Sequence, residues 1–381
     1  MARIEKHPSG YRVRWEAGKD ERGERVRRSR VFKAHEDART FMRQIAASEG
    51  RGAGSERIGD AMQNWIVYRE SMRTISPKTA ERHLGIARNL ADALGNAPLH
   101  KINSPLVESA LKRLAQIGGP AKRPMAARTI HHHRGLLSQF CKRMVSQGLM
   151  TRNPVEGTET PKQPRVKAKA PTLDQVETLL DLCSKSGRCN GLLRIIALTA
   201  LHTGARRGEI LALKWGCVDL DRGEIRIEAA LEQTQQPDGM RLRFKAPKTE
   251  AGLRTIPISG TLASALRAHR VTQAEKRIRV GAAYAGNHLV FANEIGEPLT
   301  PSDVSKRLGH LARDAGFGRD VQPLHGLRHL HGTRLNAAGL DAKTIQARLG
   351  HEDISITLQL YVHEDDENAR KAADVFEGLG G

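Results

Sequence analysis

Six residues in the C-terminal half of the chain carry side chains that together suit the cleavage of a phosphodiester. In chain order they are Arg206 in TGARRGEI, Lys248 in KAPKTE, His325 and Arg328 in LHGLRH, His351 in RLGHED, and Tyr361. A free tyrosine has a pKa near ~10, so only about one in a thousand is ionised at neutral pH. It becomes a useful nucleophile when cations lower its pKa or when a nearby base takes its proton. Arginine, lysine and histidine side chains supply both functions, which indicates attack on a phosphate without a metal ion.

The segment around Arg206 predicts a phosphate-binding site. A glycine turn follows an apolar helix here, so Arg206 is expected in the first turn of the next helix. Backbone amides at a helix start and a guanidinium both bind phosphate oxygens. Glu209, one turn later, is expected to hold the orientation of Arg206. The alternative for this segment alone is an ordinary exposed basic turn.

The other five residues lie at positions that suit the same chemistry. Lys248 follows a predicted strand, and a lysine in a turn is either solvated or a general acid for a leaving alkoxide. His325 and Arg328 share one face if HGLRH is helical, which suits a phosphate that is neutralised while a proton moves. His351 follows the glycine that ends a predicted helix, and Tyr361 ends the next helix. A single tyrosine is more often structural, so the joint pattern carries the prediction.

The composition indicates a polyanionic partner. The chain has 381 residues, enough for two or three domains, and its 62 Lys and Arg against 42 Asp and Glu give a net charge of +20. Each Lys or Arg placed beside a phosphate releases bound counterions. No apolar stretch approaches the ~18 residues of a membrane span, and the first residues lack the apolar run of a signal peptide. We therefore expect a cytoplasmic, nucleoid-associated protein without a membrane partner.

A small sheet packed on one helix is expected for residues 1–50. Tyr11, Val13 and Trp15 alternate with arginines, which predicts a strand with one apolar and one basic face. The run RVRRSRVFK is expected to pair with it across a hairpin, and HEDARTFMRQIAASEG has helical spacing. The arginines are either a solvated face or a DNA-binding surface, and beside the other features we favour DNA. The residues concerned are Arg12, Arg14, Arg27, Arg28 and Arg30.

A helical domain without catalytic groups is expected for residues 56–155, after the linker RGAGS. Ser76 and Ser104 each precede a proline and are N-cap candidates. The predicted apolar core contains Trp65, Tyr68, Leu84, Leu90, Leu94, Leu111 and Leu114. The three adjacent histidines at 131–133 point about 100° apart on a helix, so they do not chelate one ion.

The stretch 153–171 is rich in proline and lysine and predicts an extended basic linker, with Lys167 and Lys169 placed along DNA. The third domain, residues 170–381, is expected to be α+β. Thr172 and Gln175 form a capping box, and GEIRIEA, RLRFKAP and RTIPIS alternate as a small antiparallel sheet would. The whole chain is therefore predicted to be multidomain and mainly α.

The order and spacing of four motifs resemble the tyrosine recombinase, or phage-type integrase, family. These motifs are TGARRGEILAL, KAPKTEAGLRTIPI, LHGLRHLHGTRL and LGHEDISITLQLYVH, and together they span residues 170–381. The first two domains resemble, more weakly, the arm-site and core-site DNA-binding domains of that family. Ala205 and the long segment before Lys248 depart from the family pattern without touching a catalytic position.

The resemblance implies a role for each of the six residues. Arg206 and Arg328 would bind the non-bridging oxygens of the scissile phosphate, and Tyr361 would attack to form a 3′-phosphotyrosyl link. Lys248 would protonate the 5′-oxygen. His325 would handle the proton of the tyrosine and His351 would hydrogen-bond the phosphate. No cofactor, metal or ATP is implied.

The same resemblance implies the setting of the reaction. Members of the family act as tetramers on double-stranded DNA with core and arm attachment sites, and they integrate and excise a phage or another mobile element. DNA-bending and directionality (excisionase) proteins accompany relatives. The segment after Tyr361 is expected to dock on a neighbouring protomer.

Three other classes of protein share part of this pattern. A type IB topoisomerase uses related chemistry, but the arm-like first domain and the spacing from LGH to Tyr361 favour recombination. A catalytically silent DNA-binding regulator needs the basic surface and not the six residues. A metal-dependent nuclease would use histidines or carboxylates and would be sensitive to chelators.

Overall fold

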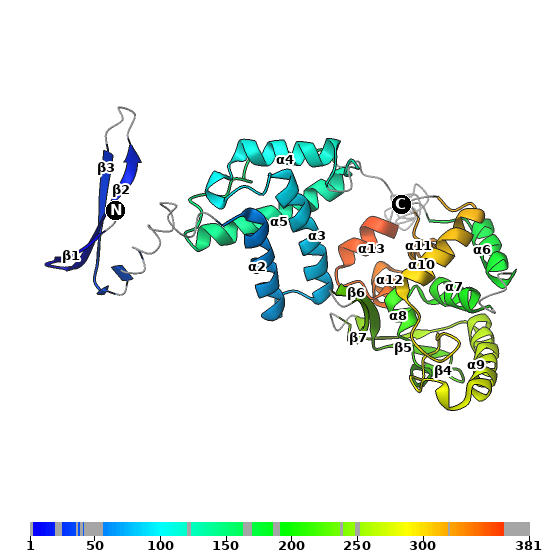
Figure 1. Cartoon of the computed structure of the whole chain (residues 1–381). Helices are drawn as coiled ribbons and strands as arrows, with labels where there is room; N and C mark the ends of the chain where they lie inside the picture. Colours follow the sequence, from blue (N-terminus) through cyan, green and yellow to red (C-terminus); the bar gives the residue numbers. More distant parts are fainter. Residues whose placement is uncertain are drawn as a thin grey trace, which may run out of the picture. The chain divides into compact units, whose positions relative to one another are not determined.

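The computed structural model consists of two compact units, Met1–Arg165 and Val166–Gly381. It describes residues 3–19, 25–35, 37–38, 41, 56–119, 123–162, 170–185, 191–236, 239–247, 252–318 and 321–361. Helices predominate in both units, and the strands form small antiparallel sheets (Figure 1). The predicted fold class, multidomain and mainly α with small sheets, is confirmed. Among the described helices, none has the length and apolarity needed to cross a bilayer.

The N-terminal part is a three-stranded antiparallel sheet in the order β1-β2-β3. The strands are β1 (Arg3–His7), β2 (Gly10–Lys19) and β3 (Arg25–Phe32). The predicted pairing of the two basic runs is present, whereas β1 was not expected from the sequence. One face is apolar: Val13 and Ala38 are fully buried, and around them pack Ile4, Tyr11, Trp15, Phe32 and Phe41. Most of the helix predicted after His35 lies outside the described residues.

The remainder of the first unit is helical. Its elements are α2 (Ile58–Ser71), α3 (Pro77–Ala93), η1 (Leu99–Lys101), α4 (Ser104–Gln116) and α5 (Ala127–Ser146). Ser76 caps α3 as predicted, but the cap of α4 is Asn103, whose side chain accepts the amide of Leu106, and not Ser104. Of the predicted core residues Tyr68 is wrong, since 55% of it is exposed. The others pack in or against one apolar core.

The predicted linker begins later in the structure than the sequence indicates. Arg134 of α5 donates hydrogen bonds to the carbonyl of Val155 and to the hydroxyl of Thr158, at 3.2 and 3.1 Å. Asn153 and Val155 are buried. The described residues from 153 to 161 therefore pack on α5, because hydrogen bonds and apolar burial fix them there. Lys167 and Lys169 lie outside the described residues.

The second unit contains eight described helices. They are α6 (Leu173–Lys185), α7 (Leu192–Thr203), α8 (Arg207–Leu211), α9 (Gly260–Val280), α10 (Pro301–Asp314), α11 (Pro323–Ala337), α12 (Ala342–Leu349) and α13 (Ile354–Tyr361). Of these, α6 to α11 contribute to one apolar core, whereas Ile345 and Leu349 of α12 form a separate small cluster with Leu335. Two short 3₁₀ turns, η2 (Trp215–Cys217) and η4 (Gly281–Ala283), connect them. The predicted capping box is present, since Thr172 and Gln175 exchange hydrogen bonds of 3.0 and 3.3 Å. α7 is mostly buried, as its apolar sequence predicted, although Arg194 is exposed.

The strands of the second unit form two structures where the sequence predicted one sheet. β4 (Val218–Asp219), β5 (Glu224–Ile227) and β8 (Arg254–Pro257) form a three-stranded antiparallel sheet. The predicted middle strand, RLRFKAP, belongs instead to β7 (Gly239–Lys245), which pairs only with β6 (Ala230–Gln236) in a separate hairpin. The segment that seemed long before Lys248 is this hairpin.

Candidate active site

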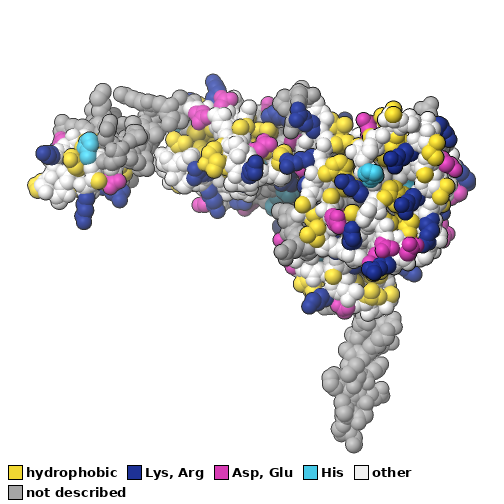
Figure 2. Space-filling view, turned by 90° about the horizontal axis from the view of Figure 1, so that it is seen from below, with side chains coloured by type: hydrophobic (Ala, Val, Ile, Leu, Met, Phe, Trp, Pro, Cys, Tyr) yellow, Lys and Arg dark blue, Asp and Glu magenta, His cyan; other side chains and the backbone are white. Residues whose placement is uncertain are grey.

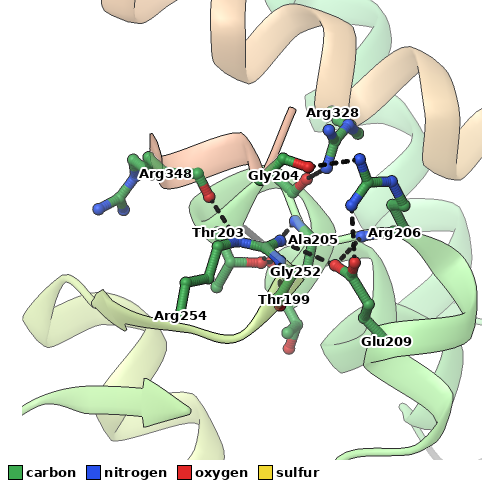
Figure 3. A network of polar contacts seen from close by, with 11 residues as sticks. Thr199, Thr203, Gly204, Ala205, Arg206, Glu209, Gly252, Arg254, Arg328 and Arg348 are labelled. Carbon is green, nitrogen blue, oxygen red and sulfur yellow. Dashed lines mark hydrogen bonds and ion pairs between the residues drawn. The ribbon is translucent and has the colours of Figure 1, made fainter. Parts of the chain in front are cut away.

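Arg206 lies at the corner between two helices of the second unit. Gly204 ends α7 in the left-handed conformation (φ 65°), and Arg206 is the N-cap of α8. The carboxylate of Glu209 accepts the backbone amide and the Nη1 of Arg206, both at 2.9 Å (Figure 3). The Nη2 of Arg206 donates to the carbonyl of Gly350 at 2.7 Å. The expected contact between Glu209 and Arg206 is therefore present, and the guanidinium stays 46% exposed.

Glu209 is itself buried and shared between two arginines. Its second partner is Arg254 of β8, whose Nη2 lies 2.8 Å from Oε2. Burial by itself would raise the pKa of Glu209, but the hydrogen bonds and charges of Arg254 and Arg206 outweigh it and hold that pKa below its usual value. The carboxylate is ionised at neutral pH and joins the two guanidinium groups.

Arg328 and His325 both project from α11, as the spacing predicted. Arg328 is 4% exposed, and its Nη1 donates to the carbonyl of Gly204 at 2.6 Å. The ring of His325 meets that of His329 edge-on, with 5.5 Å between centroids. Partial burial, with the nearby charge of Arg328, lowers the pKa of His325. At neutral pH this imidazole is therefore able to accept a proton.

His351 follows the turn that ends α12. Gly350 adopts the left-handed conformation (φ 66°), as the LGH motif predicted. His351 is 7% exposed, and its Nδ1 lies 2.9 Å from the hydroxyl of Thr357. Burial, followed by the charges of Arg328 and Arg206, lowers the pKa of His351 to about 4. The ring is neutral at physiological pH and is held next to two arginines.

Three of the six residues line one open cleft. Arg206, His325 and Arg328 face a cleft of about 620 Å³, together with Arg207, Gly208, Ser305, Gln322 and Leu324. Tyr361 is the last residue of α13, and its side chain lies outside the described part of the structure. Lys248 also lies outside the described residues. The structure thus brings Arg206, Arg328, His325 and His351 together from α8, α11 and the turn after α12.

Behind these residues lies a second pair of polar side chains, His331 and Arg348. The Nδ1 of His331 donates to the carbonyl of Leu201 at 2.8 Å, and its Nε2 accepts from the Nε of Arg348 at 3.0 Å. Arg348 also donates to the carbonyls of His202 and Pro257, both at 3.0 Å. Burial and the charge of Arg348 lower the pKa of His331 to about 4, so the ring is neutral. His331 therefore links α11 to α7 and α12 through hydrogen bonds.

No metal-binding group of three or more His, Cys, Asp or Glu side chains occurs within the described ranges. Of the adjacent histidines on α5, His133 is buried and its ring contacts the carbonyl of Thr129 and the amide of Asn89. His131 instead contacts Thr160 and the carbonyl of Pro161. The neighbouring rings have separate partners, as their angular spacing on a helix predicted.

The arginines of the N-terminal sheet do not share one face. Arg14 lies 3.4 Å from Glu5, and Arg12 pairs with the same Glu5 across the strands. Arg30 stands opposite the buried Val13, and its guanidinium lies over the rings of Phe32 and Phe41. Arg30 therefore covers the apolar face. The side chains of Arg27 and Arg28 lie outside the described residues.

The comparisons with known proteins agree with this arrangement. The model of the phage integrase family matches residues 171–368. The tyrosine recombinase XerC-like protein of Caldanaerobacter subterraneus subsp. tengcongensis is 27% identical over 97% of this chain and 96% of its own. The integrase of the transposon Tn1549, solved with a circular intermediate DNA, superimposes with a TM-score of 0.69 at 20% identity, covering 84% of this chain and 100% of that one. The lambda integrase tetramer bound to a Holliday junction gives a TM-score of 0.55 at 19% identity, over 94% and 95% of the two chains.

The chain belongs to the phage integrase family and is a site-specific recombinase of the tyrosine type.

Proposed function

We propose that this recombinase cleaves and rejoins double-stranded DNA through a 3′-phosphotyrosyl intermediate on Tyr361. The observation that carries the proposal is that Arg206, His325 and Arg328 line one open cleft, while the neutral His351 lies close to both arginines. Such a group of fixed donors stabilises the charge that develops on a phosphate in the transition state. α13 ends at Tyr361, next in the chain after the turn that holds His351.

Each side chain has a defined part in the proposed reaction. The phenolic oxygen of Tyr361 attacks the phosphorus, and the bond to the 5′-oxygen breaks. His325 accepts the tyrosine proton, since its lowered pKa leaves the ring uncharged at neutral pH. Lys248 delivers a proton to the leaving 5′-oxygen, while Arg206, Arg328 and His351 bind the non-bridging oxygens. Attack by a 5′-hydroxyl on the phosphotyrosine then reseals the strand, so neither ATP nor a metal ion is required.

The proposed substrate is a pair of attachment sites that join a phage or another mobile element to its host DNA. The Tn1549 and lambda integrases, which share this fold, were solved on a circular intermediate and on a Holliday junction. We extend the binding of double-stranded DNA and the tetrameric assembly to this chain by analogy. The net charge of +20 supports a nucleic-acid partner. DNA-bending and excisionase proteins belong to the same proposal.

We assign the N-terminal domain, residues 1–50, to arm-site DNA and the helical domain, residues 56–155, to core-site DNA. Lys and Arg side chains are spread over the face drawn in Figure 2, with acidic side chains scattered among them. Arg12 and Arg14 are the arginines of the sheet that best suit DNA contact, since they lie opposite the apolar face. Lys167 and Lys169 remain proposed DNA contacts.

Covalent trapping tests the proposal directly. The full chain is incubated in EDTA with nicked suicide duplexes tiled from the DNA that flanks its own gene. We expect a denaturation-resistant adduct with the wild type and none with Tyr361→Phe. Tyr68→Phe serves as a matched control, because Tyr68 is an exposed tyrosine far from the proposed chemistry in sequence.

Each alternative class predicts a different result. An adduct that persists in Tyr361→Phe would identify another nucleophile. Binding without an adduct at any site would favour a silent DNA-binding regulator, and cleavage that EDTA abolishes would favour a metal-dependent nuclease. Relaxation of supercoiled DNA without attachment sites would favour a type IB topoisomerase.

A further inference from the structure

We propose that Arg254 is a positioning residue of the active site, which sets the geometry of Arg206 and of the turn that carries His351. Three donors of one guanidinium reach three segments of the chain (Figure 3). The Nη2 of Arg254 donates to Glu209 at 2.8 Å, its Nε to the carbonyl of Arg348 at 2.8 Å, and its Nη1 to the carbonyl of Gly252 at 3.2 Å. This proposal rests on the proposed function and deepens it.

The sheet register explains why an arginine at this position has a specific task. Arg254 pairs with Ile227, and two residues later Ile256 pairs with Ile225. All three isoleucines are buried, so Arg254 occupies an inward position, and its side chain is only 7% exposed. A buried charge is costly unless it is paired and hydrogen-bonded. The pairing partner here is the carboxylate that also holds Arg206.

Through Glu209, Arg254 acts on the first candidate phosphate ligand. Glu209 uses Oε2 for Arg254 and for the amide of Arg206, and Oε1 for the guanidinium of Arg206. The position of the carboxylate therefore depends on both arginines. If Arg254 is removed, the buried carboxylate keeps Arg206 as its one charged partner, and the guanidinium of Arg206 is drawn toward it.

Through the carbonyl of Arg348, Arg254 also acts on the turn that presents His351. Arg254 holds the carbonyl of residue 348, and Arg206 holds the carbonyl of residue 350. Arg206 and Arg254, which both bind Glu209, thus donate hydrogen bonds to two carbonyls of the same turn. A planar guanidinium with several fixed donors makes such a three-way contact, whereas the single ammonium of a lysine does not.

The test compares Arg254→Gln and Arg254→Lys with Arg226→Gln in the full chain. Arg226 is the matched control: it lies on the neighbouring strand β5, pairs with Thr255, and is 56% exposed on the opposite face. We measure the single-turnover rate of the Tyr361 adduct and the affinity for the same duplex. Arg254→Gln is expected to slow adduct formation by ~100-fold, as ångström-scale misplacement does, with affinity changed by less than about 3-fold. Arg254→Lys should recover part of the rate, and Arg226→Gln should match the wild type.

A double-mutant cycle with Glu209→Gln separates positioning from general support of the fold. If Arg254 acts through Glu209, the double variant should be no slower than the slower single variant, because both substitutions break one linkage. The double variant also leaves no unpaired carboxylate, so it is informative even if Arg254→Gln unfolds. If the rate reductions of the two single variants multiply in the double variant, Arg254 acts independently of Glu209 and the proposal is overturned. An Arg254→Gln rate equal to that of Arg226→Gln would do the same.

Hydrogen exchange provides a readout that does not depend on cleavage. The amides of Gly350 and His351 both donate to the carbonyl of Gln346. Arg254→Gln should raise their exchange rates by ~10-fold or more relative to Arg226→Gln, since the turn loses one of its anchors. Unchanged exchange would contradict the proposal. If the wild type forms no adduct and Arg254→Gln still speeds exchange at Gly350 and His351, the proposed function is rejected and the positioning role of Arg254 stands.

Discussion

Burial beside arginines keeps His331 and His351 of the second unit uncharged at neutral pH. His331 and His351 both have a pKa of about 4, because each is buried and faces guanidinium groups. The geometry at His331 agrees with a neutral ring, since its Nε2 accepts a hydrogen bond from Arg348 and its Nδ1 donates to a carbonyl. Protonation would place a cation against Arg348. The folded state therefore disfavours protonation at these positions.

This has a measurable effect on stability. Above pH 6.5 His331 is neutral in both the folded and the unfolded chain, so its contribution is constant. Between pH 6.5 and about 4 the unfolded chain binds a proton that the folded chain does not, and the free energy of unfolding falls as the pH falls. His331→Asn should reduce this loss by about 3 kcal/mol over that window. Denaturant unfolding of wild type and variant at several pH values measures it, and parallel curves would contradict the assignment.

Residue types and spacing placed Arg206, Glu209 and His351 next to helix ends, and Arg328 one turn after His325 on a helix, and the structure has this arrangement. They did not reveal Arg254. Arg254 begins the predicted strand RTIPIS and shares a face with Ile256. The sequence does not show that this face is buried, and only the strand register does. Partners such as Glu209, 45 residues earlier in the chain, are set by tertiary packing that no local pattern encodes.

At the scale of elements, the corner between α7 and α8 depends on Gly204. Its φ of 65° is a conformation that residues with a side chain adopt with strain. A Cβ built there would lie 2.5 Å from Leu349 and 2.8 Å from His331, and the carbonyl of Gly204 accepts from Arg328. One glycine thus allows α7, α11 and α12 to approach closely around the site.

Gly204→Ala should therefore destabilise the catalytic unit by roughly 2–4 kcal/mol, from backbone strain and overpacking together. Thermal unfolding measures the change. Gly260→Ala, at the start of α9, is the control, since a Cβ there meets no atom within 4 Å. If both variants melted at the same temperature, the corner would tolerate a side chain and the packing argument would be wrong.

Elements were predicted well where their ends carry local chemistry. The caps of α3 and α6 follow from Ser76 and Thr172. Partner choice among strands was predicted less well: RLRFKAP alternates like the strands around it, yet it pairs with β6. Alternation identifies a strand, but it does not identify the neighbour, which depends on contacts between distant segments.

At the scale of the whole molecule, a net charge of +20 should make DNA binding strongly dependent on salt. A plot of log affinity against log salt has a negative slope. The magnitude of this slope decreases by about 0.9 for each phosphate that a cationic side chain no longer neutralises. Replacing Arg12 and Arg14 together by alanine should therefore reduce the magnitude of the slope on arm-site DNA by roughly 1–2. Filter binding over a range of salt concentrations measures this.

Arg30→Ala is the comparison for that experiment. Because the guanidinium of Arg30 lies over Phe32 and Phe41, its loss should weaken the small sheet and leave the salt slope nearly unchanged. A slope that changes with Arg30 and not with Arg12 and Arg14 would mean that the sheet presents its other face to DNA.

The carboxylate shared by two arginines also limits how this recombinase can evolve. A single substitution at Glu209 leaves two guanidinium groups facing each other, and one at Arg254 leaves a buried anion with half of its compensation. A single substitution at either position impairs the enzyme, so positions 209 and 254 should vary together or not at all. An effort to retarget the enzyme to new DNA would therefore keep this pair fixed and diversify exposed positions, such as those of the β6–β7 hairpin.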